Sequence, residues 1–466
     1  MKACLAATLI LALLADASAS RPDILFIVSD DQGPDTIHAL GNKIIQTPNL
    51  DRLAAHGTVF TRAIAAYPIC HVSRAEMATG CTAFRAYVRY PNPPVDPKLA
   101  TFAGTFQKAG YVTCFTGKWH LDGQPKARGY SMTSGLFSSG GAKAGKGQES
   151  DTQGHRVTGY TGWTFKTDEG KVEIEKGIGL TPRTSEHVAD GAVAFLRQKH
   201  DEPFLLHVNF TAPHDPRMMP PGYEGRYDPA KLPLPENFAP QHPFDHGNLD
   251  GRDETLLQKP LAEADYRREL ACYHAVITHM DEQIGRVLAA LDETGRAENT
   301  IVIFTTDQGL AMGRHGLMGK QNMYEHTIGV PLILAGPSIP AGRTAPAQCY
   351  LRDIFPTCCD LAGLKIPETV QGRSLVPILS GRSGQAHPFL VSYFTDTQRA
   401  IRDDRWKLIR YPKAGRAQLF DLRNDPLELH DLSNEAAAGP TMERLGLQLT
   451  EWLRDNGDSM TARQGG

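Results

Sequence analysis

The sequence predicts an α/β protein with a large, mostly parallel sheet flanked by helices and a smaller C-terminal α+β domain. Three largely apolar runs support the large sheet, at residues 23–29, 203–210 and 300–306, and each is followed by a polar residue. Such runs are typical of parallel strands buried on both faces. Stretches with helical periodicity at 184–198 and 261–291 lie between them. This alternation is expected where helices connect parallel strands.

The remaining parts of the large domain are predicted from shorter patterns. A helix at 101–109 precedes a strand at 111–115, and a strand at 330–334 precedes a helix near 351–361. Two segments lack periodicity. The stretch 131–180 is rich in Gly and polar residues and is predicted to be a long loop insertion. The stretch 218–259 is rich in Pro and Gly and is predicted to be an extended surface excursion.

The pattern changes near residue 387. Short alternating runs separated by turns predict a small antiparallel sheet. The runs are 390–394, 399–402, 406–411 and 418–422, and a helix at about 441–455 is expected to cover one face of the sheet. We place the domain boundary near residue 385, which gives a large domain over residues 20–385 and a small domain over residues 386–466.

Residues 1–19 are predicted to be a secretory signal peptide. Lys2 precedes an apolar run from Leu5 to Leu14, and Ala17-Ser18-Ala19 offers a cleavage site. No later segment is apolar enough to span a bilayer. We therefore expect an exported, soluble protein, in the periplasm or outside the cell. The net charge of -3 gives no reason to expect nucleic acid or an anionic membrane surface as a partner.

The cysteine count indicates at least one cysteine that is not part of a disulfide. The sequence has eight cysteines, of which Cys4 lies in the predicted signal peptide. An odd number then remains in a protein expected in an oxidising compartment. The sequence leaves open whether any of the others form disulfides.

Residues 70–80 read C-H-V-S-R-A-E-M-A-T-G, with a cysteine and an arginine four residues apart. Ser73 is a candidate N-cap for a helix running through Arg74 to Ala78. Cys70 would then lie at the helix N-terminus, where free N–H groups favour an anion and lower a thiol pKa. The planar guanidinium of Arg74 suits an oxyanion. A buried thiol beside a surface arginine is the alternative.

Carboxylates follow two of the predicted strands. Asp30 and Asp31 end the first run, and Asp307 and Gln308 end the third. The carboxyl ends of parallel strands meet at one edge of a sheet, where α/β proteins bind their ligands. Adjacent carboxylates repel each other unless a cation is present, and hard oxygen ligands suit calcium or magnesium. The Asp-Asp pair also fits an ordinary turn.

Basic residues occupy the loops after other predicted strands. Lys118 and His120 are two positions apart, so they point to one face of an extended chain. His214 lies in a loop beside two prolines, and Lys320 lies in a loop with several glycines that also holds His315. The Lys118 and His120 pair alone also fits an exposed loop, and His315 fits either a substrate contact or a structural role.

The order of these motifs resembles that of the type I sulfatases of the alkaline phosphatase superfamily. After Asp30-Asp31 and C-x-x-S-R come G-K-W-H at 117–120, A-P-H at 212–214, D-Q-G at 307–309 and H-G-x-x-G-K at 315–320. The resemblance extends to L-F-D-L-x-N-D-P at 419–426 and so covers nearly the whole mature chain. Two positions depart from the family pattern. Val72 stands where Pro or Ala is usual, and Gln308 where Asn or His is more common.

The resemblance implies a role for each of these residues. In the family, a formylglycine-generating enzyme converts the cysteine to formylglycine, so Cys70 would become the nucleophile and Arg74 would hold its hydrate. One Ca²⁺ would be bound by Asp30, Asp31, Asp307 and Gln308. Sulfate binding and proton transfer would fall to Lys118, His120, His214 and Lys320. His120 would act on the hydrate, and His214 or Lys320 would protonate the leaving alcohol.

These implied roles predict an exported sulfatase with an alkaline phosphatase-like catalytic domain over residues 20–385. The expected substrate is a sulfate monoester on a polysaccharide-derived sugar, such as a glycosaminoglycan or algal glycan, attacked in an exo manner. Two alternatives remain at this stage. One is a phosphate or phosphonate monoester hydrolase of the same superfamily. The other is a non-catalytic sulfated-glycan binder, if Val72 keeps Cys70 unmodified.

Overall fold

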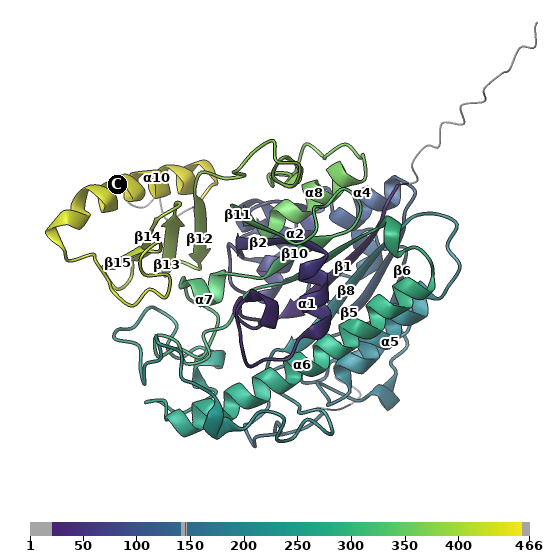
Figure 1. Cartoon of the computed structure of the whole chain (residues 1–466), viewed down its shortest axis with the longest axis horizontal. Coiled ribbons are helices and arrows are strands. Elements are labelled where there is room, and N and C mark those ends of the chain that lie inside the picture. The colour runs from purple at the N-terminus through teal and green to yellow at the C-terminus, as the bar shows by residue number, and fades with distance from the viewer. Residues whose placement is uncertain (1–20, 141–144, 146, 459–466) are drawn as a thin grey trace, which may run out of the picture.

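The computed structural model describes residues 21–140, 145 and 147–458. The signal peptide predicted for residues 1–19 lies outside the described residues. The predicted fold class is confirmed: a nine-stranded mixed sheet carries helices on both faces, and a separate four-stranded antiparallel sheet lies beside it (Figure 1). Among the described residues, no helix has the length and apolar character needed to cross a membrane.

The large sheet is mostly parallel. Its strands are β1 (Asp23–Asp30), β2 (Gly57–Ile64), β5 (Val112–Lys118), β6 (Met132–Ser138), β7 (Thr164–Lys166), β8 (Phe204–Pro213), β9 (Thr300–Thr306), β10 (Leu332–Ala335) and β11 (Arg343–Tyr350). They lie in the order β11, β2, β10, β9, β1, β8, β5, β6 and β7. β10 and β7 run antiparallel to their neighbours. The central strands β9, β1, β8 and β5 are parallel, so their carboxyl ends share one edge.

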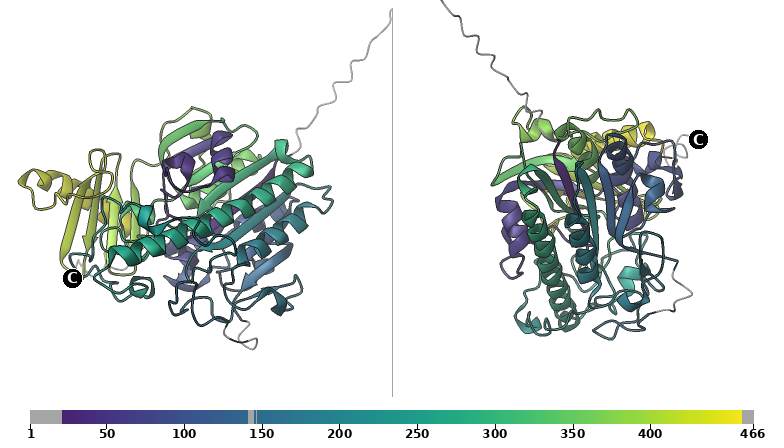
Figure 2. Two further views of the ribbon diagram at one scale, coloured as in Figure 1. Left: turned by 60° about the horizontal axis from the view of Figure 1, so that its bottom comes forward. Right: turned by 90° about the vertical axis from the view of Figure 1, so that its right-hand side faces the viewer.

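Strand β1 contributes to the core on both sides of the sheet. Leu25 and Ile27 pack against helices of one face, whereas Ile24, Phe26 and Val28 pack against helices of the other, because successive side chains of a strand alternate. The first face carries α1 (Pro48–Ala55), α5 (Thr184–Leu196) and α6 (Glu263–Glu293), and the second carries α2 (Cys70–Thr79), α4 (Phe102–Lys108) and α8 (Ile354–Leu361). Figure 2 shows the long helix α6 lying along its face of the sheet.

Two segments that were predicted to lack regular structure contribute more to the folded core than expected. The predicted loop insertion at 131–180 contains β6 and β7, which extend the edge of the large sheet. β6 was not predicted because Gly135 and two serines interrupt its apolar pattern. Its pairing with β5 is a tertiary contact. The segment 218–259 is only partly a surface excursion, since it folds back and buries Asp253 and Glu254. Shorter elements connect the core: α3 (Ala83–Ala86), β3 (Tyr87–Arg89), β4 (Asn92–Val95), α7 (Glu325–Ile328) and α9 (Val376–Leu379).

The small antiparallel sheet forms where the alternating pattern predicts it. It consists of β12 (Leu390–Phe394), β13 (Gln398–Arg402), β14 (Trp406–Tyr411) and β15 (Arg416–Asp421) in sequential order. Helix α10 (Gly439–Asp455) covers it with Leu445, Leu449 and Leu453, which share one helix face because they are four residues apart. The boundary near residue 385 stays a prediction. Buried residues of both sheets, such as Ile64 and Ile401, belong to one apolar cluster.

The seven cysteines in the described part of the chain are all free and buried. They are Cys70, Cys81, Cys114, Cys272, Cys349, Cys358 and Cys359. Disulfides therefore do not link these residues, and burial of apolar side chains holds their surroundings together.

A buried ion pair joins helix α2 to the turn after β11, and a hydrogen bond to the same carboxylate links both to the small sheet. Arg352 donates to Glu76 Oε2 over 3.0 Å, and its guanidinium lies 3.5 Å from the ring centre of Tyr350. The other oxygen of Glu76 accepts hydrogen bonds from the Tyr393 hydroxyl of β12 (2.7 Å) and the Ala83 amide (2.9 Å). Both charged side chains are buried. Removal of one partner would leave a buried charge without compensation.

We expect Arg352→Ala to lower the free energy of unfolding by about 3–5 kcal/mol, because the buried Glu76 side chain would lose its ion-pair partner. Urea-induced unfolding followed by tryptophan fluorescence measures the change. Lys365→Ala is the control, because Lys365 pairs with Glu368 on the exposed surface, where ion pairs contribute little. Equal effects of the two substitutions would contradict the role given to the buried pair.

Candidate active site

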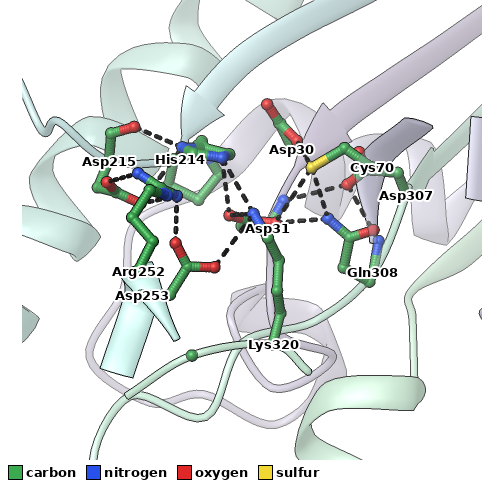
Figure 3. A network of polar contacts seen from close by, with 12 residues as sticks. Asp30, Asp31, Cys70, His214, Asp215, Arg252, Asp253, Asp307, Gln308 and Lys320 are labelled. Atoms are coloured by element: carbon green, nitrogen blue, oxygen red, sulfur yellow. Dashed lines mark hydrogen bonds and ion pairs between the residues drawn. The ribbon is translucent and has the colours of Figure 1, made fainter. Parts of the chain in front are cut away.

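The candidate site lies at the carboxyl edge of the large sheet. Asp30 and Lys118 end β1 and β5, and His214 and Asp307 directly follow β8 and β9. The structure brings together the ten residues predicted from the sequence, nine of them buried and His120 partly exposed: Asp30, Asp31, Cys70, Arg74, Lys118, His120, His214, Asp307, Gln308 and Lys320. Figure 3 shows Asp31 between Cys70 and Lys320, with His214 and Gln308 on opposite sides. Ligands of α/β proteins bind at this edge.

Helix α2 places Cys70 at its first residue. Ile69 is the N-cap in an extended conformation, so the prediction that Ser73 caps the helix is wrong. Ser73 lies within the first turn because the Ile69 carbonyl already accepts the Ser73 amide. The Ser73 hydroxyl instead donates to the Asp307 carbonyl over 2.6 Å. This contact ties the start of α2 to the loop after β9.

Each of the three carboxylates has one oxygen held by a buried cation. Lys118 Nζ lies 2.5 Å from Asp30 Oδ2, and Lys320 Nζ lies 2.6 Å from Asp31 Oδ2. The third carboxylate, Asp307, has its Oδ2 atom 2.9 Å from a guanidinium nitrogen of Arg74. The same Arg74 side chain also donates to Asn209 over 2.8 Å. These contacts fix the orientation of all three carboxylates.

The second oxygens of Asp30 and Asp31 lie near the cysteine sulfur. Cys70 Sγ lies 3.3 Å from Asp30 Oδ1 and 4.0 Å from Asp31 Oδ1. Asp307 Oδ1 accepts the backbone amide of Asp31 over 3.2 Å. Gln308 Nε2 lies 2.5 Å from Asp31 Oδ1, and Gln308 Oε1 is buried without a hydrogen-bond partner. Asp30 and Asp31 therefore each direct one oxygen toward the Cys70 sulfur. The Gln308 amide faces the same place with its nitrogen, 3.1 Å from Cys70 Sγ, and would offer its oxygen to a divalent cation once the amide is turned over.

Burial and mutual repulsion shape the charge of this cluster. Burial raises the pKa of Asp31 to about 7, with Asp30 and Asp307 adding to the rise against the effect of Lys320. Burial and Asp30 also raise the pKa of Asp307. Asp30 is the exception, because Lys118, His214 and Arg74 outweigh burial and hold its pKa well below the usual value. A cation among these oxygens would relieve the repulsion.

The Cys70 thiol does not have the lowered pKa predicted from its position at the helix N-terminus. Burial raises its pKa well above the usual value, and the carboxylates of Asp30 and Asp307 add to the rise. Desolvation and like charge therefore outweigh the helix N-terminus. The chain by itself does not set up Cys70 as a thiolate nucleophile.

His214 and Lys320 form a hydrogen-bonded pair. Lys320 Nζ lies 3.0 Å from His214 Nε2, and His214 Nδ1 donates to the backbone carbonyl of Asp215, which can only accept. Nε2 is therefore the acceptor for the lysine. Burial and Lys320 lower the pKa of His214 well below its usual value, while Asp31 and other anions outweigh burial and raise that of Lys320. The proton of this pair resides on the lysine.

His120 lies between the buried cluster and an open cleft. The cleft has a volume of about 480 Å³, and its lining includes His71, Tyr87, His120 and Trp163. The His120 ring lies 5.4 Å from that of Trp163, and its Nδ1 atom has no hydrogen-bond partner. Burial and Lys118 lower its pKa well below the usual value, so His120 is neutral and able to accept a proton.

Two residues of the site were missed by the sequence reasoning. Asn209, which binds Arg74, lies near the end of a strand that was predicted, so its position was a usable signal. Tyr160, whose hydroxyl lies 2.6 Å from Asp30 Oδ2, comes from the segment predicted to be a loop insertion, where no pattern marks it. His315, left open between two roles, stacks on Tyr324 with 4.0 Å between ring centres, away from Cys70, and is structural.

Comparison with known proteins agrees with this geometry. A family model described as Sulfatase matches residues 22–364, and one described as N-sulphoglucosamine sulphohydrolase, C-terminal, matches residues 313–455. An arylsulfatase of Clostridium perfringens is 31% identical over 440 residues, which is 89% of this chain and 90% of that protein. The chain belongs to the sulfatase family. It is thus a sulfuric ester hydrolase of the alkaline phosphatase superfamily, as the motif order implied.

Other relatives show the range of substrates around this sulfatase. A choline-sulfatase of Rhizobium meliloti is 29% identical and covers 90% of this chain and 84% of its own. A protein solved in complex with its substrate D-glucosamine-2-N,6-O-disulfate has a TM-score of 0.77 and 25% identity, over 94% of this chain and 98% of that chain. The relatives of this chain therefore include a choline-sulfatase and a protein solved with a sulfated sugar as its substrate.

Proposed function

We propose that this sulfatase hydrolyses sulfate monoesters of polysaccharide-derived sugars, using formylglycine made from Cys70 and one bound Ca²⁺. The observation that carries the proposal is the position of Cys70. Its sulfur lies among inward-facing carboxylate oxygens, with the cations of Arg74, Lys118 and Lys320 around them. A cysteine in these surroundings is poorly placed to act as a thiolate, but it is well placed to carry an aldehyde hydrate beside a metal.

The calcium would be held by Asp30, Asp31, Asp307 and Gln308. The donor set fits, because Asp30 and Asp31 each direct one oxygen toward Cys70 and Asp307 is hydrogen-bonded to the Asp31 amide beside them. The Gln308 amide lies against Asp31 and Cys70, and its buried oxygen has no other partner. Calcium prefers such hard oxygen ligands. When bound, it would lower the pKa of a hydroxyl at residue 70 and neutralise charge on the sulfate ester.

The basic residues would bind the sulfate group and move protons. Arg74, Lys118 and Lys320 surround Cys70 with positive charge, which stabilises charge that develops on the sulfate oxygens. Lys320 holds the proton of the Lys320–His214 pair, so it is the better placed donor for the leaving alcohol. His120 is neutral and has an unpartnered ring nitrogen. It would remove a proton from the residue-70 side chain after the alcohol has left.

A single cation site favours a sulfate ester over a phosphate ester. The described residues contain one group of closely spaced metal-ligating side chains, centred on Asp30, Asp31, Cys70 and His214. Two-metal phosphoesterases need a second set of ligands about 4 Å away. Lys118 and Lys320 occupy the flanks of this cluster instead, which supports a substrate that one divalent cation and fixed side-chain charges neutralise.

A sugar is the proposed leaving group because of the cleft beside His120. Its volume of about 480 Å³ lies in the range of small-molecule sites, and its aromatic rings offer apolar faces for stacking. The relative solved with a disulfated glucosamine supports the same class of substrate. Export also stays a proposal, based on the predicted signal peptide, as does maturation by a formylglycine-generating enzyme.

The mass of the peptide that contains Cys70, isolated from the native host, tests the proposed mechanism. We expect the mass of formylglycine in place of cysteine, which would show that Val72 is compatible with modification. A panel of sulfated mono- and oligosaccharides, with choline sulfate alongside, then tests the substrate. An unmodified thiol with full sequence coverage would contradict the mechanism and favour a glycan-binding role. Hydrolysis of choline sulfate without any sugar sulfate would contradict the substrate class.

A further inference from the structure

Tyr160 reaches the centre of the site from a segment that carries no sulfatase motif. Its side chain is buried, and its hydroxyl donates to Asp30 Oδ2 over 2.6 Å. Lys118 Nζ lies 5.0 Å from the centre of its ring, and the His214 ring meets it edge-on at 4.9 Å. Tyr160 therefore contacts a candidate calcium ligand and two candidate sulfate-binding residues at once.

The backbone of Tyr160 is held in an unfavourable conformation. Its φ angle is 58°, in the left-handed region that bulky residues rarely adopt. The conformation is fixed by a hydrogen bond from the Trp163 amide to the Tyr160 carbonyl (3.0 Å) and by ring contacts with Trp163 and Phe137. Strain of this kind persists where the surroundings impose it and is concentrated at functional sites. The fold thus directs this side chain into the site at a cost in stability.

The hydrogen bond from Tyr160 matters because Asp30 Oδ2 has two donors. Lys118 is the other donor, at 2.5 Å, and the proposed function requires Lys118 to bind the sulfate group. When Lys118 turns toward a sulfate oxygen, Tyr160 remains on Asp30 Oδ2. The Asp30 carboxylate then keeps its orientation, with Oδ1 still facing the Cys70 sulfur. A phenol suits this task because it donates without adding charge.

We propose that Tyr160 is a positioning residue that fixes the Asp30 carboxylate for the divalent cation and leaves Lys118 free for the substrate. This inference rests on the proposed calcium site. Hydrogen-bond partners of metal ligands commonly set metal affinity, and their removal costs roughly 10–100-fold in affinity or activity. The contribution of Tyr160 is therefore measurable on the resting protein, without turnover.

The test is Tyr160→Phe, which removes one oxygen atom and keeps the ring. We expect isothermal titration of the calcium-free protein to show a Kd for calcium about 10–100-fold higher than that of the unsubstituted protein. Raising the calcium concentration should restore most of kcat. A Kd within twofold of the unsubstituted value would overturn the proposal. So would an activity loss that saturating calcium does not restore, because the hydroxyl would then act on the substrate.

Tyr227→Phe is the matched control. The Tyr227 hydroxyl is also buried and hydrogen-bonded, to Thr278 over 2.6 Å and to the Gln46 amide over 2.9 Å, but it has no contact with the site. We expect its calcium Kd to be unchanged. Failure of the proposed function can be distinguished from failure of the Tyr160 proposal. A protein that binds calcium but hydrolyses no sulfate ester still allows the calcium Kd of Tyr160→Phe to be compared with that of the unsubstituted protein. Absence of calcium binding by the unsubstituted protein would overturn the Tyr160 proposal.

Discussion

Cys70→Ala is expected to lower sulfate ester hydrolysis by about 10⁴-fold or more, the scale seen when a catalytic nucleophile is removed. Alanine offers neither a thiol for modification nor an oxygen for attack. The calcium ligands and basic residues would remain, so binding of calcium and of a sulfated sugar should persist. Activity is measured on a sulfated sugar under single-turnover conditions. Calcium and sugar binding are measured by titration.

Cys114→Ala is the control for this substitution. Cys114 is a buried free thiol within β5, and its sulfur contacts the Phe115 carbonyl and the Thr116 side chain of the same strand. We expect this variant to keep its activity, with a modest loss of stability from the small cavity. Residual activity of Cys70→Ala above roughly one hundredth of the unsubstituted value would exclude Cys70 as the nucleophile.

Removal of calcium is expected to lower activity by roughly 10³-fold, because a metal that polarises the ester and activates the nucleophile contributes several kcal/mol. The three carboxylates would then repel one another, so the melting temperature should also fall. Dialysis against a chelator, followed by activity and thermal melting measurements, tests both effects. Added calcium should restore both, whereas magnesium, with its stricter octahedral geometry, should restore less.

Asp307→Asn removes one proposed calcium ligand without a chelator. It therefore distinguishes the loss of calcium binding from other damage that a chelator could cause. The substitution keeps the shape of the side chain and removes a charge that faces Arg74. We expect this variant to need more calcium for activity and to respond less to it in melting temperature. If chelation left both the activity and the melting temperature of the unsubstituted protein unchanged, the calcium site would be excluded.

The sequence by itself determined the central strands, the small antiparallel sheet and ten residues of the candidate site. β1, β8 and β9 were predictable because strands buried on both faces must be apolar throughout, which leaves an uninterrupted run. Asp30 and Asp307 could be placed together because parallel strands share a carboxyl edge. The small sheet was predictable because turn residues separate its short strand runs, although β12 and β13 are buried on both faces.

Only the tertiary structure decided the features that depend on distant partners. β6 forms because β5 offers an unpaired edge, a fact that is absent from its own Gly- and Ser-containing sequence. Ser73 donates to Asp307 rather than capping its helix. The pKa of Cys70 rises because folding buries the thiol and places it beside the carboxylates of Asp30 and Asp307. Tyr160 reaches Asp30 across 130 residues of chain. Local patterns record burial and turns, whereas hydrogen-bond partners and electrostatic fields are set by residues that meet only after folding.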